Sequence, residues 1–215
     1  MRIAFVLMIL ALSVMLFSVR PANAFIINEV LADPAAGLNG DANGDGVASA
    51  NNDEFLEFFN TTAFPLDISG WDVNDAVKTR HVFPANTILP PQGLLVVFGG
   101  GDPQLTASPW QKASTGTLSL NNTSEVISLF DAHDQLIEQV IYGAEAGKDE
   151  SIVRNPEGTG NAFVGHSWLD DSNGRIFSPG YLIHPPAPVT AAVPELLPFW
   201  SLAMGLGFVR VFTRR

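Results

Sequence analysis

Glu54-Phe55-Leu56-Glu57-Phe58-Phe59 is the stretch that decides the fold of this chain. Successive side chains of a β-strand point to opposite faces, so Phe55, Glu57 and Phe59 would share one face and the residues between them the other. Large apolar side chains then lie on both faces. This pattern predicts a strand that is covered on both sides by other elements or by a partner.

Further short apolar or alternating runs lie before and after this strand, and glycine, proline, asparagine and aspartate separate them. Regular spacing of such runs predicts an all-β fold, an antiparallel β-sandwich, with helix confined to the two ends of the chain. Three tryptophans, Trp71, Trp110 and Trp168, are expected to fill the core or cover its edges. The predicted strands are residues 25–31, 54–60, 66–73, 79–83, 94–98, 125–131, 136–142, 151–154 and 166–169.

Composition limits the classes of function. The chain has 215 residues, a net charge of −11 and no cysteine, which excludes disulfides, thiolate zinc sites and a thiol nucleophile. Its central region, residues 25–193, holds 21 acidic and 6 basic residues. Such a field repels phosphate backbones, so no nucleic-acid partner is expected, whereas cations are natural partners.

The N-terminal segment predicts export. Met1-Arg2 precedes an apolar run from Ile3 to Phe17, and Ala22-Asn23-Ala24 supplies a small-x-small site. A positive start, a short apolar helix and such a site are typical of a signal peptide, here residues 1–24, removed by signal peptidase after Ala24. The alternative is an uncleaved anchor.

The C-terminal segment predicts a membrane tail. A proline-rich spacer, residues 184–193, precedes Val193-Pro194-Glu195 and an apolar run from Leu196 to Val209, followed by terminal arginines. Fourteen residues span only about 21 Å as a helix, so crossing the inner membrane needs the run extended to Phe212. The arginines would stay cytoplasmic.

Several motifs of residues 25–183 resemble the lamin tail domain, an immunoglobulin-like sandwich. Its three opening motifs resemble Ile27-Asn28-Glu29-Val30, Asp53-Glu54-Phe55-Leu56-Glu57 and Leu66-Asp67-Ile68-Ser69-Gly70-Trp71. The resemblance continues in order through Phe83-Pro84, Leu89-Pro90-Pro91, Leu94 to Phe98 and Phe177-Ser178-Pro179-Gly180. The resemblance implies an immunoglobulin-like fold, and it does not imply a catalytic activity.

The tail, residues 194–215, resembles the PEP-CTERM sorting signal of Gram-negative bacteria, in which Pro-Glu-Pro precedes one hydrophobic helix and a basic cluster. Here Leu196 stands in place of the second proline. The resemblance implies recognition by an exosortase-type enzyme that releases the protein to the cell surface or the extracellular matrix. If it fails, the same segment is a plain membrane anchor.

Asp41-Ala42-Asn43-Gly44-Asp45-Gly46 is the sharpest local signal for a ligand. Side-chain oxygens at alternate positions followed by glycine match the first half of an EF-hand calcium loop. Asp41, Asn43 and Asp45 would bind through side chains and Val47 through its carbonyl. The twelfth position is Asn52, so the closing carboxylate would be Asp53, one place late. The alternative is a solvated, metal-free insertion.

Catalytic motifs are weak in this sequence. His81, His133, His166 and His184 lack ligand spacing and are expected at the surface or in turns. Gly99-Gly100-Gly101 lacks the Lys-Ser/Thr ending of a phosphate loop. Glu54 and Glu57 offer a carboxylate pair. We therefore expect a surface or matrix binding module that meets surface polysaccharide or an envelope protein, with a secreted metal-dependent hydrolase as the alternative.

Overall fold

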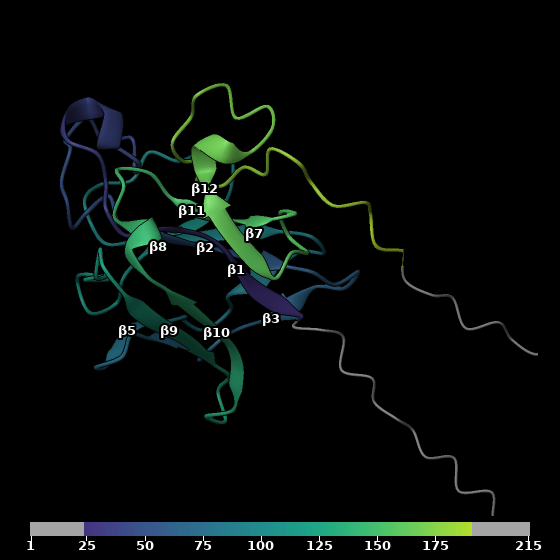
Figure 1. Cartoon of the computed structure of the whole chain (residues 1–215). Coiled ribbons are helices and arrows are strands. Elements are labelled where there is room, and N and C mark those ends of the chain that lie inside the picture. The colour runs from purple at the N-terminus through teal and green to yellow at the C-terminus, as the bar shows by residue number, and fades with distance from the viewer. Residues whose placement is uncertain (1–23, 191–215) are drawn as a thin grey trace, which may run out of the picture.

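A computed structural model describes residues 24–190, which form two β-sheets packed face to face (Figure 1). The predicted signal peptide and sorting tail lie outside the described residues, except for Ala24. Within residues 24–190 no helix is long and apolar enough to cross a membrane. The all-β prediction for the central region is confirmed, and the architecture is consistent with an immunoglobulin-like sandwich.

The larger sheet has six strands in the order β12-β11-β1-β2-β7-β8. Its neighbours are antiparallel except β7 and β8, which run parallel, so the prediction of a purely antiparallel sandwich needs this one correction. The bounds are β1 (Phe25–Leu31), β2 (Phe55–Asn60), β7 (Leu94–Phe98), β8 (Trp110–Lys112), β11 (Ile152–Asn155) and β12 (Ala162–Gly165).

The smaller sheet has four strands in the order β10-β9-β4-β5, and a two-stranded ribbon, β3-β6, stands beside it. Three short 3₁₀ turns complete the described elements. The bounds are β3 (Leu66–Asp67), β4 (Asp72–Asn74), β5 (Thr79–Val82), β6 (Ile88–Leu89), β9 (Glu125–Phe130), β10 (Leu136–Tyr142), η1 (Gly37–Gly40), η2 (Ala144–Ala146) and η3 (His166–Trp168).

Strand β2 is covered on both faces, as its sequence predicts. Leu56 and Phe58 belong to the central core between the sheets. Phe55 lies in a second cluster on the outer face of the six-stranded sheet, and Phe59 lies in a third. Long loops cover this outer face (Figure 1), so the six-stranded sheet is the buried middle layer of the domain.

Two predicted strands are wrong in detail. Residues 66–73 are not one strand, because Gly70 adopts φ +75° and turns the chain between β3 and β4. Residues 166–169 form η3 instead of a strand. The short strands β6, β8 and β12 were not predicted, since two to four residues carry too little alternation to be recognised.

A bulge in β1 places two polar residues on one face. The register between β1 and β2 shifts between Ile27 and Glu29. Ile27 and Val30 belong to the central core. Asn28 and Glu29 both bind side chains on the outer face, where Asn28 donates to Glu57 (2.9 Å) and Glu29 accepts from Ser151. The bulge thus explains why the motif Ile-Asn-Glu-Val is not strictly alternating.

Candidate functional site

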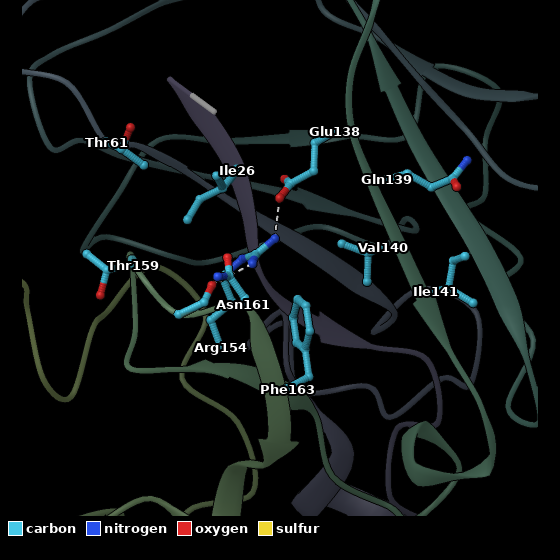
Figure 2. A pocket seen from close by; sticks show the side chains of 12 residues that line it. Ile26, Thr61, Glu138, Gln139, Val140, Ile141, Arg154, Thr159, Asn161 and Phe163 are labelled. Carbon is cyan, nitrogen blue, oxygen red and sulfur yellow. Dashed lines mark hydrogen bonds and ion pairs between the residues drawn. The ribbon is translucent and has the colours of Figure 1, made fainter. Parts of the chain in front are cut away.

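A cleft of about 580 Å³ opens where the edge of the four-stranded sheet faces the β11–β12 turn. This volume falls within the usual range of ligand sites, roughly 300–1,000 Å³. Figure 2 shows the side chains around it, with Arg154 and Glu138 meeting inside. The lining residues are Ile26, Thr61, Glu138, Gln139, Val140, Ile141, Arg154, Gly158, Thr159, Gly160, Asn161 and Phe163.

A buried ion pair between Arg154 and Glu138 joins the two sheets at the base of this cleft. The paired register of β1 and β11 covers Glu29 and Val30 and stops short of Ile27. The main chain of Ile27 instead donates to Glu138 Oε2 (2.5 Å) and accepts from Arg154 Nε (2.6 Å). The two side chains therefore take the place of a strand ladder at this point.

Each of the three nitrogens of the Arg154 guanidinium donates one hydrogen bond within the fold. Besides Ile27 and Glu138, it donates to the Gly160 carbonyl (2.7 Å) and lies 4.9 Å from the centre of the Phe163 ring. Burial lowers the pKa of Arg154, and the Glu138 carboxylate opposes that effect. With its donors used in this way, Arg154 fixes the cleft and is not a free anchor for an anionic ligand.

The remaining walls of the cleft carry no charge. Thr61, Gln139, Thr159 and Asn161 supply hydroxyl and amide groups, and Ile26, Val140, Ile141 and Phe163 supply apolar surface. Such walls bind a neutral ligand by hydrogen bonds and apolar contact. A nucleophile with an adjacent base, which covalent catalysis needs, is not among the lining residues.

The acidic loop, residues 41–53, holds its predicted ligands by hydrogen bonds from its own main chain. Asp41 accepts from the main-chain N–H groups of Asp45 and Gly46 (3.1 and 2.9 Å). Asn43 accepts from Asp45 N (2.9 Å), and Asp45 accepts from the N–H of Val47 (2.8 Å). The loop is thus closed by carboxylate-to-amide bonds.

Asp53 also turns into this loop. It is fully buried, and its two oxygens accept from Asn43 N (3.1 Å) and Ser49 N (2.7 Å). Desolvation raises the pKa of Asp53, and the negative charges of Asp41 and Asp45 raise it further. The Asp53 carboxylate therefore lies close enough to the other two to be repelled by them. The exposed Asp45 differs, because hydrogen bonds from Asp102 and Val47 lower its pKa.

Metal binding by this loop stays a prediction. Among residues 24–190 no group of three or more histidine, cysteine, aspartate or glutamate side chains is arranged to hold a metal ion. The Val47 side chain is 63% exposed, and its N–H is used within the loop. A cation would have to draw Asp41, Asp45 and Asp53 closer together than they lie here.

Glycines 99–101 have a role that sequence reasoning missed. A Cβ at Gly99 would lie 1.9 Å from the Asn51 carbonyl oxygen. One at Gly101 would lie 2.4 Å from Asn43 Nδ2 and 2.6 Å from Asp45 Oδ2. The triple glycine therefore lets the end of β7 pack directly against the acidic loop. The spacing of residues in the sequence does not indicate that this glycine run lies against the acidic loop.

Three buried carboxylates hold the C-terminal segment against the outer face of the six-stranded sheet. Glu29 accepts from Ser178 N (3.0 Å), Glu57 from Gly180 N (2.6 Å) and Glu157 from His184 N (2.6 Å). Desolvation raises the pKa of Glu29 to about 7. Desolvation and the nearby Glu29 also raise the pKa of Glu57. The neutral forms of Glu29 and Glu57 are thus favoured beneath this strap, residues 176–184.

The histidine prediction is wrong for His81, a buried strand residue, and is met by His166 only in that this residue lies in the turn η3. His81 is buried and contacts Gln111 (2.8 Å) and Ser114 N (3.2 Å). His166 is fully buried between Ser178 Oγ and the Arg175 carbonyl, both at 2.9 Å. Desolvation lowers the pKa of both rings. His133 and His184 are exposed, as predicted.

The aromatic prediction fails at one residue. Trp71 packs against the central core, and Trp110 packs against the cluster around Phe55. Trp168, by contrast, is 77% exposed on η3. His166, two positions before it, and Leu169, directly after it, are both buried, and they fix the turn with the indole outside.

The carboxylate pair considered for hydrolysis is split by the fold. Glu54 accepts from Leu120 N (3.2 Å), and Leu120 belongs to the central core. Glu57 faces the opposite side of the six-stranded sheet, where it binds Asn28 and Gly180. Burial raises the pKa of Glu54 to about 8. The two groups cannot act together on one substrate.

Comparison with known proteins gives a family. No curated protein matches the chain. The model of the lamin tail domain matches residues 18–144, which is more than half of the chain. The match ends before β11, so Arg154, the strap and the Phe177–Gly180 motif lie beyond it. By this match the chain belongs to the lamin tail domain family.

Proposed function

We propose that this lamin tail domain protein is an exported surface or extracellular-matrix module that binds or assembles and does not catalyse a reaction. The observation that supports this best is the cleft beside β10, whose accessible walls are neutral and whose one ion pair is consumed by the fold. The buried side chains of Glu29, Glu57 and His166 are likewise engaged in structural hydrogen bonds.

Export and sorting rest on the two terminal segments. In this proposal signal peptidase removes residues 1–24, and an exosortase-type enzyme acts at Val193-Pro194-Glu195 after the tail has held the protein in the inner membrane. The protein then meets surface polysaccharide or an envelope protein, and its net charge of −11 argues against nucleic acid.

Calcium is the proposed structural cofactor. Asp41, Asn43, Asp45 and Asp53 would supply side-chain oxygens, and Val47 its carbonyl. Calcium prefers such oxygen donors, and the raised pKa of Asp53 reflects carboxylates that would gain from neutralisation. In this role the ion would stabilise the loop and would take no part in chemistry.

A labelling experiment tests the location. Because the chain has no cysteine, Val77→Cys, at a position 81% exposed, provides a single site for a membrane-impermeant maleimide. Labelling of intact cells that make the protein is the expected result. Labelling only after the outer membrane is permeabilised would overturn surface sorting, and labelling only after lysis would overturn export.

A second experiment tests the cleft. Thr159→Trp fills the cleft from its exposed rim, and Thr106→Trp places the same bulk on an exposed loop outside it. Binding of the protein to an isolated fraction of envelope polysaccharide and protein should fall with Thr159→Trp alone. Equal binding by both variants would exclude the cleft as the binding surface.

A further inference from the structure

We propose that β10 is the edge at which two copies of this chain join, so that their four-stranded sheets form one eight-stranded sheet. This inference rests on the proposed function, because it names a second copy as the partner that the cleft receives.

The cleft follows the outer edge of β10. Four consecutive residues, Glu138 to Ile141, line it. Since alternate side chains of a strand point to opposite faces, a cavity that touches all four runs along the edge and not over one face. Strand β10 ends the order β10-β9-β4-β5, so in the described structure it pairs with a strand on one side only. The cleft is space for an added strand.

The other edge of the same sheet is covered. Ser114 Oγ accepts from Val82 N (3.0 Å), and Thr115 N donates to the Arg80 carbonyl (3.4 Å). These bonds block strand addition at β5. The edge at β10 carries a bulge near Ile137, and the stretch Gln139–Tyr142 after it pairs regularly with β9 and is proposed to receive the added strand.

Charge favours a second copy at this edge. Two molecules of net charge −11 repel each other except where their surfaces are neutral. The exposed side chains of β10 are Leu136, Gln139 and Ile141, all uncharged, and its one acidic residue, Glu138, is paired with Arg154. A cationic partner would find no exposed acid on this strand.

The exposed side chains of β10 also suit this contact. Ile141 is 68% exposed and Leu136 52% exposed, and natural edge strands usually avoid such apolar surface by placing lysine or proline there. A two-fold axis beside β10 sets the two strands antiparallel, which continues the antiparallel order of the sheet. Both copies then use the same surface.

Disulfide trapping of the full chain tests the pairing. Two variants are made, Gln139→Cys and Ile141→Cys, and each is purified in mild detergent because of the apolar ends of the chain. Each variant is oxidised alone, and a mixture of the two is oxidised as well. Cβ atoms of opposite residues in paired strands lie about 5 Å apart, within disulfide reach, so cross-linked dimer should exceed that of Val77→Cys about tenfold. Equal yields from β10 and Val77 cysteines would overturn the proposal.

Charge variants supply the matched control. Ile141→Asp in the Gln139→Cys chain should abolish the cross-link, whereas Val82→Asp, at the covered edge of the same sheet, should leave it unchanged. Circular dichroism checks that both variants fold. The yield should rise with salt, because about 1 M salt shortens the screening length to about 3 Å and removes repulsion between acidic copies. A cross-link yield that falls with salt would mean that the two copies meet through charged groups, which contradicts pairing along the uncharged β10 edge.

The outcome is separable from the proposed function. If β10 cysteines fail to cross-link while Thr159→Trp still weakens binding of the envelope fraction, the second copy is excluded and the cleft remains a binding site for another molecule. If both experiments fail, the cleft has no binding role.

Discussion

The Arg154 guanidinium and the Glu138 carboxylate form an ion pair that links the two sheets, and both side chains also bind the main chain of Ile27. This arrangement closes the open side of the sandwich without a strand. A buried pair is costly to break from one side only, because the remaining charge keeps its desolvation penalty and loses its compensation.

Arg154→Met should therefore lower the free energy of unfolding by about 3–5 kcal/mol. Adding Glu138→Gln should restore part of that loss, since the double variant leaves no unpaired charge. Urea denaturation of the two single variants and the double variant measures the coupling. Arg175→Met is the control, because the Arg175 side chain is exposed, lies 5.9 Å from the centre of the Tyr181 ring, and can be shortened while the main-chain bonds of Arg175 stay in place. If the losses of the two single variants simply add in the double variant, Arg154 and Glu138 do not stabilise the fold as a pair.

Glu29 should make the domain lose stability as the pH rises. Its pKa is about 7 in the fold, above the usual value of 4.5, so the folded state holds a proton that the unfolded state releases first. The free energy of unfolding should fall between about pH 4.5 and pH 7 and then level off, by roughly 3 kcal/mol at 1.36 kcal/mol per unit.

Glu29→Gln should reduce this slope and leave the part that comes from Glu54 and Glu57, whose pKa values burial also raises. The neutral amide can still accept from Ser178 N and Ser151 Oγ and can donate to Ser178 Oγ. Thermal melts at pH 5, 6, 7 and 8 would measure the effect, with the exposed Glu145→Gln as control. A wild-type melting temperature that rises across this range, with no change in Glu29→Gln, would show that Glu29 is ionised in the fold.

Asp45→Asn tests calcium while keeping an oxygen for the loop. The wild-type chain should gain roughly 2.7 kcal/mol when free calcium reaches 100 times the Kd, and a chelator should remove the gain. Asp45→Asn should reduce the gain from calcium, and it should also lower the stability of the chelated form, because the amide keeps the hydrogen bond from Val47 N and loses the one from Asp102 N. Asp67→Asn, on an exposed turn at Ser69, is the matched control. Identical melting of the wild-type chain with calcium and with chelator would leave the loop metal-free.

Gly101→Ala tests the contact between the triple glycine and the acidic loop. Its φ is +73°, and a Cβ there would collide with Asn43 and Asp45. Gly116→Ala is the control, because φ is +90° but nothing lies within 4 Å of the added carbon. The control should lose about 1 kcal/mol from backbone strain and Gly101→Ala clearly more. Equal losses in urea denaturation would mean that the loop yields to the methyl group.

The sequence predicted the long strands well, because five to seven residues with alternating or doubly apolar patterns leave little choice: β1, β7 and β10 have the predicted bounds. It could not predict the cleft. Arg154 and Glu138 lie 16 residues apart on different sheets, and only the end of the β1–β11 ladder brings them together. The burial of His166 could not be predicted for the same reason, since Ser178, which contacts its ring, belongs to the strap.

Deletion of residues 194–215 should release the protein from the membrane, because the apolar run from Leu196 to Val209 is the predicted anchor at that end. Fractionation of cells that make the truncated chain would show it in the soluble exported fraction. A truncated chain that stays in the membrane would mean that an uncleaved N-terminal segment also holds it.

The double variant Pro194→Ala, Glu195→Ala keeps the apolar run and removes the sorting motif. It should remain membrane-bound and lose the surface labelling of Val77→Cys, whereas a plain anchor would be indifferent to both substitutions.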